Sequence, residues 1–331
     1  MTASPLVVTA SPHLASGDTT PRIMWQVVGS LVPIIAAATW FFGVSALLVV
    51  AAATVGAVAA EWGFTKERTL SNGSALITGL LLGLSLPAGM PLWMAALGGG
   101  FGIGFGKLVF GGLGYNVFNP ALVGRAFLQA AFPVAITTWP LPGVGFWTLR
   151  GDNFARPGMR GITDAITSAT PLGLLKFEGK TTPLTNLILG NTGGSLGETA
   201  ALVIVLGGLY LAWRGYLNWR IPVSILVTVA LLSAALHLAD PTKPGPLFML
   251  FSGGLMLGAI YMATDLVTAP VTNGGRWAYG ASIGALVVVI RIWGGLPEGV
   301  MYAILIMNAF VPFLNRATQP RVFGTSRRIA R

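Results

Sequence analysis

Long apolar runs, interrupted only by glycine, proline and isolated polar residues, occupy most of this 331-residue chain. Charged residues make up 9% of the chain and apolar residues 54%, whereas an ordinary soluble domain has about 25% charged residues. So few charges cannot cover the surface of a globule in water. The sequence therefore predicts an all-α integral membrane protein and excludes a soluble enzyme.

Ten apolar stretches predict about ten transmembrane helices. Most have the roughly 17–20 residues that a tilted helix needs to cross about 30 Å of hydrocarbon. The third stretch is shorter and ends at Pro87, which predicts a broken or re-entrant helix. The stretches are 24–42, 43–60, 75–86, 91–106, 121–139, 198–213, 221–238, 246–262, 277–293 and 298–314.

The distribution of lysine and arginine predicts that both termini are cytoplasmic. With that orientation twelve basic residues fall on the cytoplasmic side, while the short loops opposite carry only Lys243 and Arg291. The net charge of +10 is then mostly a consequence of topology, and we expect no nucleic-acid partner. Residues 1–23 are polar, which predicts a cytoplasmic segment without a cleavable signal peptide. Residues 315–331 form a basic cytoplasmic tail, and the long segment 140–197 faces the other side.

A repeated spacing suggests that the helices form two related halves, 24–139 and 198–314. Trp93, Gly100 and Lys107 fall at seven-residue intervals, and so do Trp277, Gly284 and Arg291. Each series follows a proline-bearing break and precedes a glycine pair. Because five helices is an odd number, the second half is expected to be inverted in the membrane. Inverted repeats with broken helices typically surround a central site in transporters.

The chain has no cysteine and two histidines, so it supplies no structural disulfide, thiolate-bound zinc or iron–sulfur cluster of its own. We expect no metal site and no catalytic residue in the strict sense. Nearly all ten acidic residues are expected in loops or at helix ends. Asp265 alone is expected to reach membrane depth, where a charge is costly. The run Thr264 to Thr268 either lines a cavity or forms a solvated helix end, and the sequence leaves both open.

Two further local patterns concern helix packing. The glycine run from Gly98 to Gly106 resembles a dinucleotide fingerprint only superficially, and it is expected to let helices approach closely. Asn119 and Pro120 are typical of a helix N-cap followed by a first-turn proline. Arg125, one turn further on, either reaches toward the membrane surface or binds a ligand oxygen.

The long segment 140–197 carries the run Asp-Ala-Ile-Thr-Ser-Ala-Thr-Pro, from Asp164 to Pro171. It resembles Asp-x-x-Ser/Thr-Gly-Ala-Thr, the target signature of the flavin transferase that attaches FMN to a threonine. The resemblance implies that the Thr170 hydroxyl attacks the phosphate of FAD next to the flavin, AMP leaves, and FMN remains as a phosphoester. Asp164 assists this metal-dependent transfer. Thr167, Ser168 and Ala169 complete the motif, with Ser168 where glycine is commoner.

The residue types suit this chemistry. Small neighbours let the segment enter the transferase, and a residue before proline is held extended, which presents its side chain. The structural alternative is a Thr/Ser turn in which Asp164 caps a helix.

Nearly the whole chain resembles the NqrB/RnfD family. That family contains RnfD, a membrane protein of the Rnf ion-translocating electron-transport complex, and NqrB of the sodium-pumping NADH:quinone reductase. The stretches that carry the resemblance occur in the expected order. They are 21–24, 74–82, 106–116, 119–127, 262–270 and 297–309.

The resemblance implies a ten-helix inverted repeat, one covalent FMN on Thr170, and companion subunits A, B, C, E and G. Iron–sulfur centres and another covalent flavin would belong to those companions. It also allows a second, non-covalent flavin (riboflavin) among the helices, for which the sequence has no motif. The implied function is electron transfer between ferredoxin and NAD coupled to Na⁺ or H⁺ movement across a bacterial inner membrane, with a flavin transferase needed for maturation.

Two alternatives belong to other classes. Inverted five-helix repeats also build channels and transporters for small solutes, which have no reason to carry a flavin-attachment segment. A structural membrane scaffold with an unmodified Thr170 is the other. The sequence leaves open the coupling ion, the direction of electron flow and the contacts between subunits.

Overall fold

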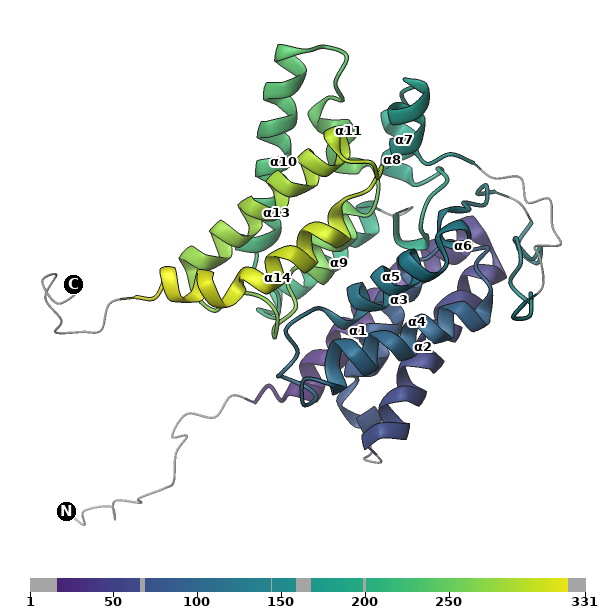
Figure 1. The fold of residues 1–331 in the computed structure, drawn as a ribbon, viewed down its shortest axis with the longest axis vertical. Helices are drawn as coiled ribbons and strands as arrows, with labels where there is room; N and C mark the ends of the chain where they lie inside the picture. The colour runs from purple at the N-terminus through teal and green to yellow at the C-terminus, as the bar shows by residue number, and fades with distance from the viewer. Residues whose placement is uncertain (1–16, 66–68, 144, 159–167, 199–200, 321–331) are drawn as a thin grey trace, which may run out of the picture.

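The computed structural model describes residues 17–65, 69–143, 145–158, 168–198 and 201–320 (Figure 1). Within these ranges the regular structure is helical, without a β-strand. The helices form two groups that lie side by side, the N-terminal half in purple and blue and the C-terminal half in green and yellow.

The N-terminal half begins with two long helices joined at Gly43, whose positive φ of 69° makes the tight connection. A shorter helix and a helix with a π turn at its end follow, and the half closes with two helices separated at Pro133. Its elements are α1 (Thr20–Phe42), α2 (Val44–Thr65), η1 (Thr69–Asn72), α3 (Ser74–Leu84), α4 (Leu92–Ile103), η2 (Gly104–Leu108), α5 (Pro120–Ala131) and α6 (Pro133–Thr137).

The described part of the C-terminal half contains three long helices, one shorter helix and one interrupted helix, and short turns connect it to the first half. The connecting elements are α7 (Pro171–Gly173), η3 (Leu174–Glu178), α8 (Leu184–Leu189) and η4 (Leu196–Glu198). The half itself consists of α9 (Ala201–Trp213), α10 (Arg220–Ala239), α11 (Pro246–Phe251), α12 (Leu255–Leu257), η5 (Gly258–Met262), α13 (Asn273–Trp293) and α14 (Val300–Ala317).

In the described part of the chain, five helices are long and apolar enough to cross a membrane: α1, α2, α10, α13 and α14. Large apolar side chains also cover the outside of the molecule, and Trp40, Trp213 and Leu238 are each more than 80% exposed. Such a surface fits lipid rather than water. These helices and this surface confirm the prediction of an all-helical integral membrane protein.

Each of the ten predicted stretches overlaps a described helix, but the boundaries differ where proline or glycine intervenes. The third stretch ends as predicted, with a turn from Ser85 to Met90 before α4. The fifth is interrupted at Phe132, because Pro133 cannot donate the next helical hydrogen bond. The eighth breaks at Ser252 to Gly254, where Gly253 has a φ of 65°.

Glycine allows close helix contacts in both halves, and the sequence predicts this for the run from Gly98 to Gly106 in the first half. A β-carbon on Gly99 of α4 would lie 2.1 Å from the carbonyl oxygen of Ala53 in α2. A β-carbon on Gly280 of α13 would lie 2.8 Å from the carbonyl oxygen of Ile221 in α10. In each half, helices thus pack closely at glycine positions where a larger side chain would not fit.

Candidate functional site

One cavity, here called the outer cavity, lies next to the predicted attachment residue and has a volume of about 700 Å³. Ligand pockets typically measure about 300–1,000 Å³, so this space accommodates an organic cofactor. Its wall combines aromatic, hydroxyl and charged side chains from both halves of the chain. They include Arg125, Trp139, Thr170, Phe177, Glu198, Glu298 and Tyr302.

Thr170 lies in this wall at the N-terminus of the helical run formed by α7 and η3. Its backbone is extended (φ −65°, ψ 154°), as expected for a residue before proline. Its hydroxyl oxygen accepts a hydrogen bond of 3.1 Å from the amide of Gly173. The side chain therefore combines access to the cavity with the geometry of an N-cap, and both interpretations of the motif retain support.

The remaining motif residues are only partly described. Ser168 and Ala169 line the same cavity, and the amide of Ser168 donates a 2.9 Å hydrogen bond to the carbonyl of Trp139. This bond fixes the segment against the end of the first half. Asp164 and Thr167 lie outside the described residues.

Arg125 joins the two halves at the outer cavity. Its guanidinium Nη2 lies 2.7 Å from Oε2 of Glu298, which precedes α14 and is 173 residues away. Both side chains are mostly buried, at 11% and 19% exposed. Of the two expectations for Arg125, the path toward the membrane surface is wrong, because its charge faces a carboxylate in the interior.

Glu198 lies close to this ion pair. Its Oε1 accepts a 2.7 Å hydrogen bond from the hydroxyl of Ser195. Arg291 approaches from the other side, with Nη1 2.6 Å from the carbonyl oxygen of Met249 and Nη2 2.9 Å from that of Ser252. Arg125, Glu198 and Glu298 thus line the outer cavity, and the guanidinium of Arg291 lies beside them, next to Gly253 of the cavity wall.

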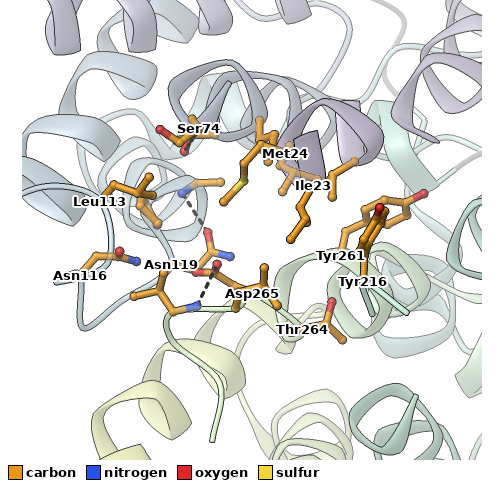
Figure 2. Close-up of a pocket in the computed structure, with 18 of the residues that line it drawn as sticks. Ile23, Met24, Ser74, Leu113, Asn116, Asn119, Tyr216, Tyr261, Thr264 and Asp265 are labelled. Atoms are coloured by element: carbon orange, nitrogen blue, oxygen red, sulfur yellow. Dashed lines mark hydrogen bonds between the residues drawn. The ribbon is translucent and has the colours of Figure 1, made fainter. Parts of the chain in front are cut away.

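A second, smaller cavity of about 100 Å³, here called the inner cavity, contains the other predicted residues. Figure 2 shows Asn116, Asn119, Thr264 and Asp265 facing Ile23 and Met24 across this space. Tyr216 and Tyr261 lie on another side. The cavity is mainly apolar with a few polar groups, which is the usual character of a small-molecule site.

Asn119 caps α5 and also links the halves. Its side-chain oxygen accepts hydrogen bonds from the amides of Ala121 and Leu122, as the predicted N-cap requires. Its amide nitrogen donates a 3.0 Å hydrogen bond to the carbonyl of Met262, at the end of η5. That carbonyl ends a helix and would otherwise be unpaired. A residue of the first half, Asn119, therefore stabilises the helix end after η5 in the second half.

Asp265 lies in the wall of the inner cavity, in agreement with the cavity-lining alternative. Its Oδ2 accepts a 3.1 Å hydrogen bond from the hydroxyl of Thr268, and its Oδ1 accepts from the amide of Val267. Thr264 lines the cavity and donates its hydroxyl to the carbonyl of Ile260. The break is therefore an ordered polar turn rather than a solvated helix end.

Lys107 and Glu61 form a buried ion pair beside the inner cavity that the sequence did not predict. Lys107 Nζ lies 2.7 Å from Oε1 of Glu61 and 2.7 Å from the hydroxyl of Ser74. Glu61 lies at a helix end, as expected for nearly all the acidic residues, but it is buried there and only 2% exposed. Glu61 lies on the last turn of α2, 46 residues from Lys107, so no local sequence pattern indicated that the two would pair.

The predicted residues thus fall into two groups rather than one site. Thr170, Ser168, Ala169 and Arg125 surround the outer cavity. Asn119, Thr264 and Asp265 surround the inner cavity, with Thr268 attached through Asp265.

Comparison with known proteins gives a consistent result. The model of the NQR2, RnfD, RnfE family matches residues 7–324. The chain is 40% identical to the D subunit of the proton-translocating ferredoxin:NAD(+) oxidoreductase complex of Clostridium ljungdahlii, over 97% of this chain and 96% of that protein. It is 38% identical to the D subunit of the Na(+)-translocating ferredoxin:NAD(+) oxidoreductase complex of Acetobacterium woodii, over 97% and 96%. It is 42% identical to the D subunit of the ion-translocating oxidoreductase complex of Stutzerimonas stutzeri, over 93% of each.

Proposed function

The chain belongs to the NQR2, RnfD, RnfE family, and from this membership we propose that it carries flavin in a redox-driven ion-translocating ferredoxin:NAD oxidoreductase complex of a bacterial inner membrane. The observation that carries the proposal is similarity over almost the full length to the D subunits of such complexes. Relatives at 40% and 38% identity are named for protons and for sodium, so overall similarity does not select the coupling ion.

Thr170 is the proposed attachment residue for FMN. Its hydroxyl opens on a cavity large enough for a flavin, and Trp139 and Tyr302 offer aromatic surface in that cavity. A phosphoester on this oxygen would stand at the N-terminus of the run 171–178, where amide N–H groups favour negative charge. Covalent attachment suits an outer position, because no flavin pool exists there to replace a cofactor that dissociates.

When bound, the flavin supplies a carrier that accepts and donates electrons one at a time. The residues of this chain hold it in place and control its surroundings. Arg125 provides a positive charge in the cavity wall, and Glu298 fixes the orientation of that guanidinium. Phe177, which is 72% exposed, lies at the rim, where a partner protein would approach.

The inner cavity is the candidate position for the second, non-covalent flavin. Asn116, Asn119 and Asp265 offer polar groups that can recognise a heterocycle. At about 100 Å³, the cavity is smaller than an isoalloxazine requires. Binding would therefore need Ile23 and Met24, at the start of α1, to move outward.

We also propose that the helices form two inverted five-helix repeats. The two most extensive helix–helix interfaces, α2 with α4 and α10 with α13, unite the second and fourth predicted helices of each half, which supports the repeat. In both, glycine makes the closest contact.

The proposed topology has both termini in the cytoplasm and residues 140–197 outside. In Figure 1 the first residues of α1 and the last residues of α14 lie toward one side of the molecule, and α6, α7 and α8 lie toward the other, which supports this arrangement. The proposed partners are subunits A, B, C, E and G of the complex, a flavin transferase during maturation, and membrane lipid.

Fluorescence after denaturation tests the flavin proposal. The full chain is expressed with and without a flavin transferase, denatured in SDS and separated on a gel. We expect a fluorescent band at the 34.4 kDa chain that requires the transferase and disappears in Thr170→Val. Thr138→Val is the matched control, because Thr138 lines the same cavity outside the motif and its variant should stay fluorescent.

A dark wild-type band, with a transferase that modifies a control substrate, would overturn the assignment of Thr170. It would leave the channel and scaffold alternatives as the functions to pursue.

A further inference from the structure

Three charged side chains line the outer cavity and a fourth lies beside them, and the proposed attachment of FMN does not by itself require them. Arg125 comes from α5, Glu198 from η4, Arg291 from α13, and Glu298 from the connection before α14. They carry two positive and two negative charges, so the group is balanced when both carboxylates are ionised. A change of one charge in the cavity disturbs that balance.

Both carboxylates face the turn formed by Gly253 and Gly254. Oε1 of Glu298 accepts a 2.6 Å hydrogen bond from the amide of Gly254. A β-carbon on Gly254 would lie 2.6 Å from this oxygen and 3.7 Å from Oε1 of Glu198. The absence of a side chain at Gly254 lets the two acids approach the same point.

The two acids are held by different partners. Glu298 forms the 2.7 Å ion pair with Arg125 and accepts the Gly254 amide, both of which favour its ionised form. Glu198 accepts from the neutral hydroxyl of Ser195. Because a second carboxylate nearby disfavours ionisation, Glu198 is the acid of this pair better placed to hold a proton.

Within the described part of the chain, the other elements around Glu198 add no competing charge at this end. The η4 turn packs against α1, α3 and α12. Neither α3 nor α12 contains an ionisable residue, and the ionisable residue of α1 is Arg22, at the opposite end of that helix. Among the described residues, the charges that face Glu198 are therefore Arg125, Arg291 and Glu298.

We propose that Glu198 is the proton-exchange group of the outer cavity, binding one proton from external water when an electron reaches the cofactor carried on Thr170. This inference rests on the proposed function. The electron comes from a reduced flavin or iron–sulfur centre of a partner protein in the complex, and one O–H bond forms on Glu198. When the electron leaves for the next acceptor, that O–H bond breaks and the proton returns to water.

Glu198 is expected to respond to charge on the cofactor because a cavity inside a protein screens their interaction only poorly. Added negative charge acts strongly on a carboxylate in the same low-dielectric space and favours its protonated form. Glu198 lines the cavity together with Thr170, so it senses that charge, and the same cavity connects it to water.

Infrared difference spectroscopy tests the assignment on the assembled complex containing the full chain, reduced with dithionite. We expect reduction to produce a C=O stretching band of a protonated carboxylic acid that shifts in D2O. The band should be lost in Glu198→Gln. It should persist in Glu178→Gln, since Glu178 lines the same cavity but pairs with Lys180 at the surface.

Survival of the band in Glu198→Gln, or its absence from the wild type, would overturn the proposal. If the complex does not assemble with the Glu198→Gln variant, the Ser195→Ala variant tests the role of Glu198 instead. Loss of the Ser195 hydroxyl should move the band to higher frequency, and an unmoved band contradicts the assignment. Gel fluorescence of each sample distinguishes failure of this inference from failure of the proposed function. A fluorescent wild type without the infrared band overturns only the role of Glu198. A dark wild type overturns the attachment of flavin as well as the role of Glu198.

Discussion

The two cavities each have a buried ion pair beside them, and the two pairs are built differently. Lys107 and Glu61 lie 2.7 Å apart with side chains 4% and 2% exposed. Arg125 and Glu298 also lie 2.7 Å apart, but they are 11% and 19% exposed and line the outer cavity together. The first pair connects α2 to η2 within one half, whereas the second connects the two halves.

From this difference we expect the pair of Lys107 and Glu61 to stabilise the fold and the pair of Arg125 and Glu298 to act on the contents of the outer cavity. The inner pair is the more deeply buried of the two, with side chains 4% and 2% exposed. The outer pair keeps contact with a cavity large enough for a cofactor. Charge that arrives in the outer cavity acts on its pair directly, while the inner pair mainly fixes the helices around it.

Breaking the inner pair is expected to have the largest effect on stability. Lys107→Met leaves the carboxylate of Glu61 buried without its cation, which typically costs about 3–5 kcal/mol. Thermal unfolding of the detergent-solubilised protein measures the loss. The double variant Lys107→Met, Glu61→Gln should recover much of it, because no uncompensated charge remains. A single variant as stable as the wild type would contradict the structural role of the pair.

Breaking the outer pair should cost less. Arg125→Met removes a charge-assisted hydrogen bond at a partly open site, so we expect a loss of about 1.5–3 kcal/mol, and covalent flavin should remain detectable. Arg316→Met, at an exposed position, serves as the control in the same unfolding assay. If Arg125→Met were as damaging as Lys107→Met, the distinction between the two pairs would be wrong.

Close helix packing at glycine can be tested in each of the two halves. Gly99→Ala and Gly280→Ala should each lower stability by about 1–3 kcal/mol, since a methyl group forces the packed helices apart. Gly104→Ala is the matched control, because a β-carbon there meets no atom within 4 Å. Thermal unfolding of the three variants checks this, and equal stability of Gly99→Ala and Gly104→Ala would refute the close approach of α2 and α4.

The smallest effect is expected at the surface, in the connection between α10 and α11. The hydroxyl and amide of Thr242 donate to Asp240 and lower the pKa of that carboxyl. Thr242→Val should raise the pKa of Asp240 toward its ordinary value. The stability contributed by a carboxylate with a lowered pKa is present at neutral pH and is lost as the pH falls through that pKa. Carboxyl NMR titration measures the shift, and an unchanged pKa would contradict it.

Local features of the fold followed from sequence because they depend on neighbouring residues. Pro87 predicts the break after α3, and Asn119 followed by Pro120 predicts the start of α5. The glycine run predicts close packing, which Gly99 confirms. These signals act over one or two helical turns, and the structure retains them.

The charged partners did not follow from sequence, because each joins residues far apart in the chain. Lys107 was interpreted as a topology signal, and its pairing with Glu61 needs the packing of α2 against α4. Arg125 meets Glu298 only when the two halves come together. The separation of the predicted residues into two cavities has the same origin. The proposed attachment motif, by contrast, is a short run of neighbouring residues, so it can be recognised in the sequence, and the structure adds the surroundings of Thr170.

Locating the flavin on the chain tests the central claim most directly. The protein, matured with the transferase, is digested, and the fluorescent fragments are sequenced by mass spectrometry. We expect one covalently modified fragment, with the flavin phosphate on Thr170 beside the outer cavity. Flavin attached at another residue such as Thr167, or no modified fragment from fully matured protein, would contradict it.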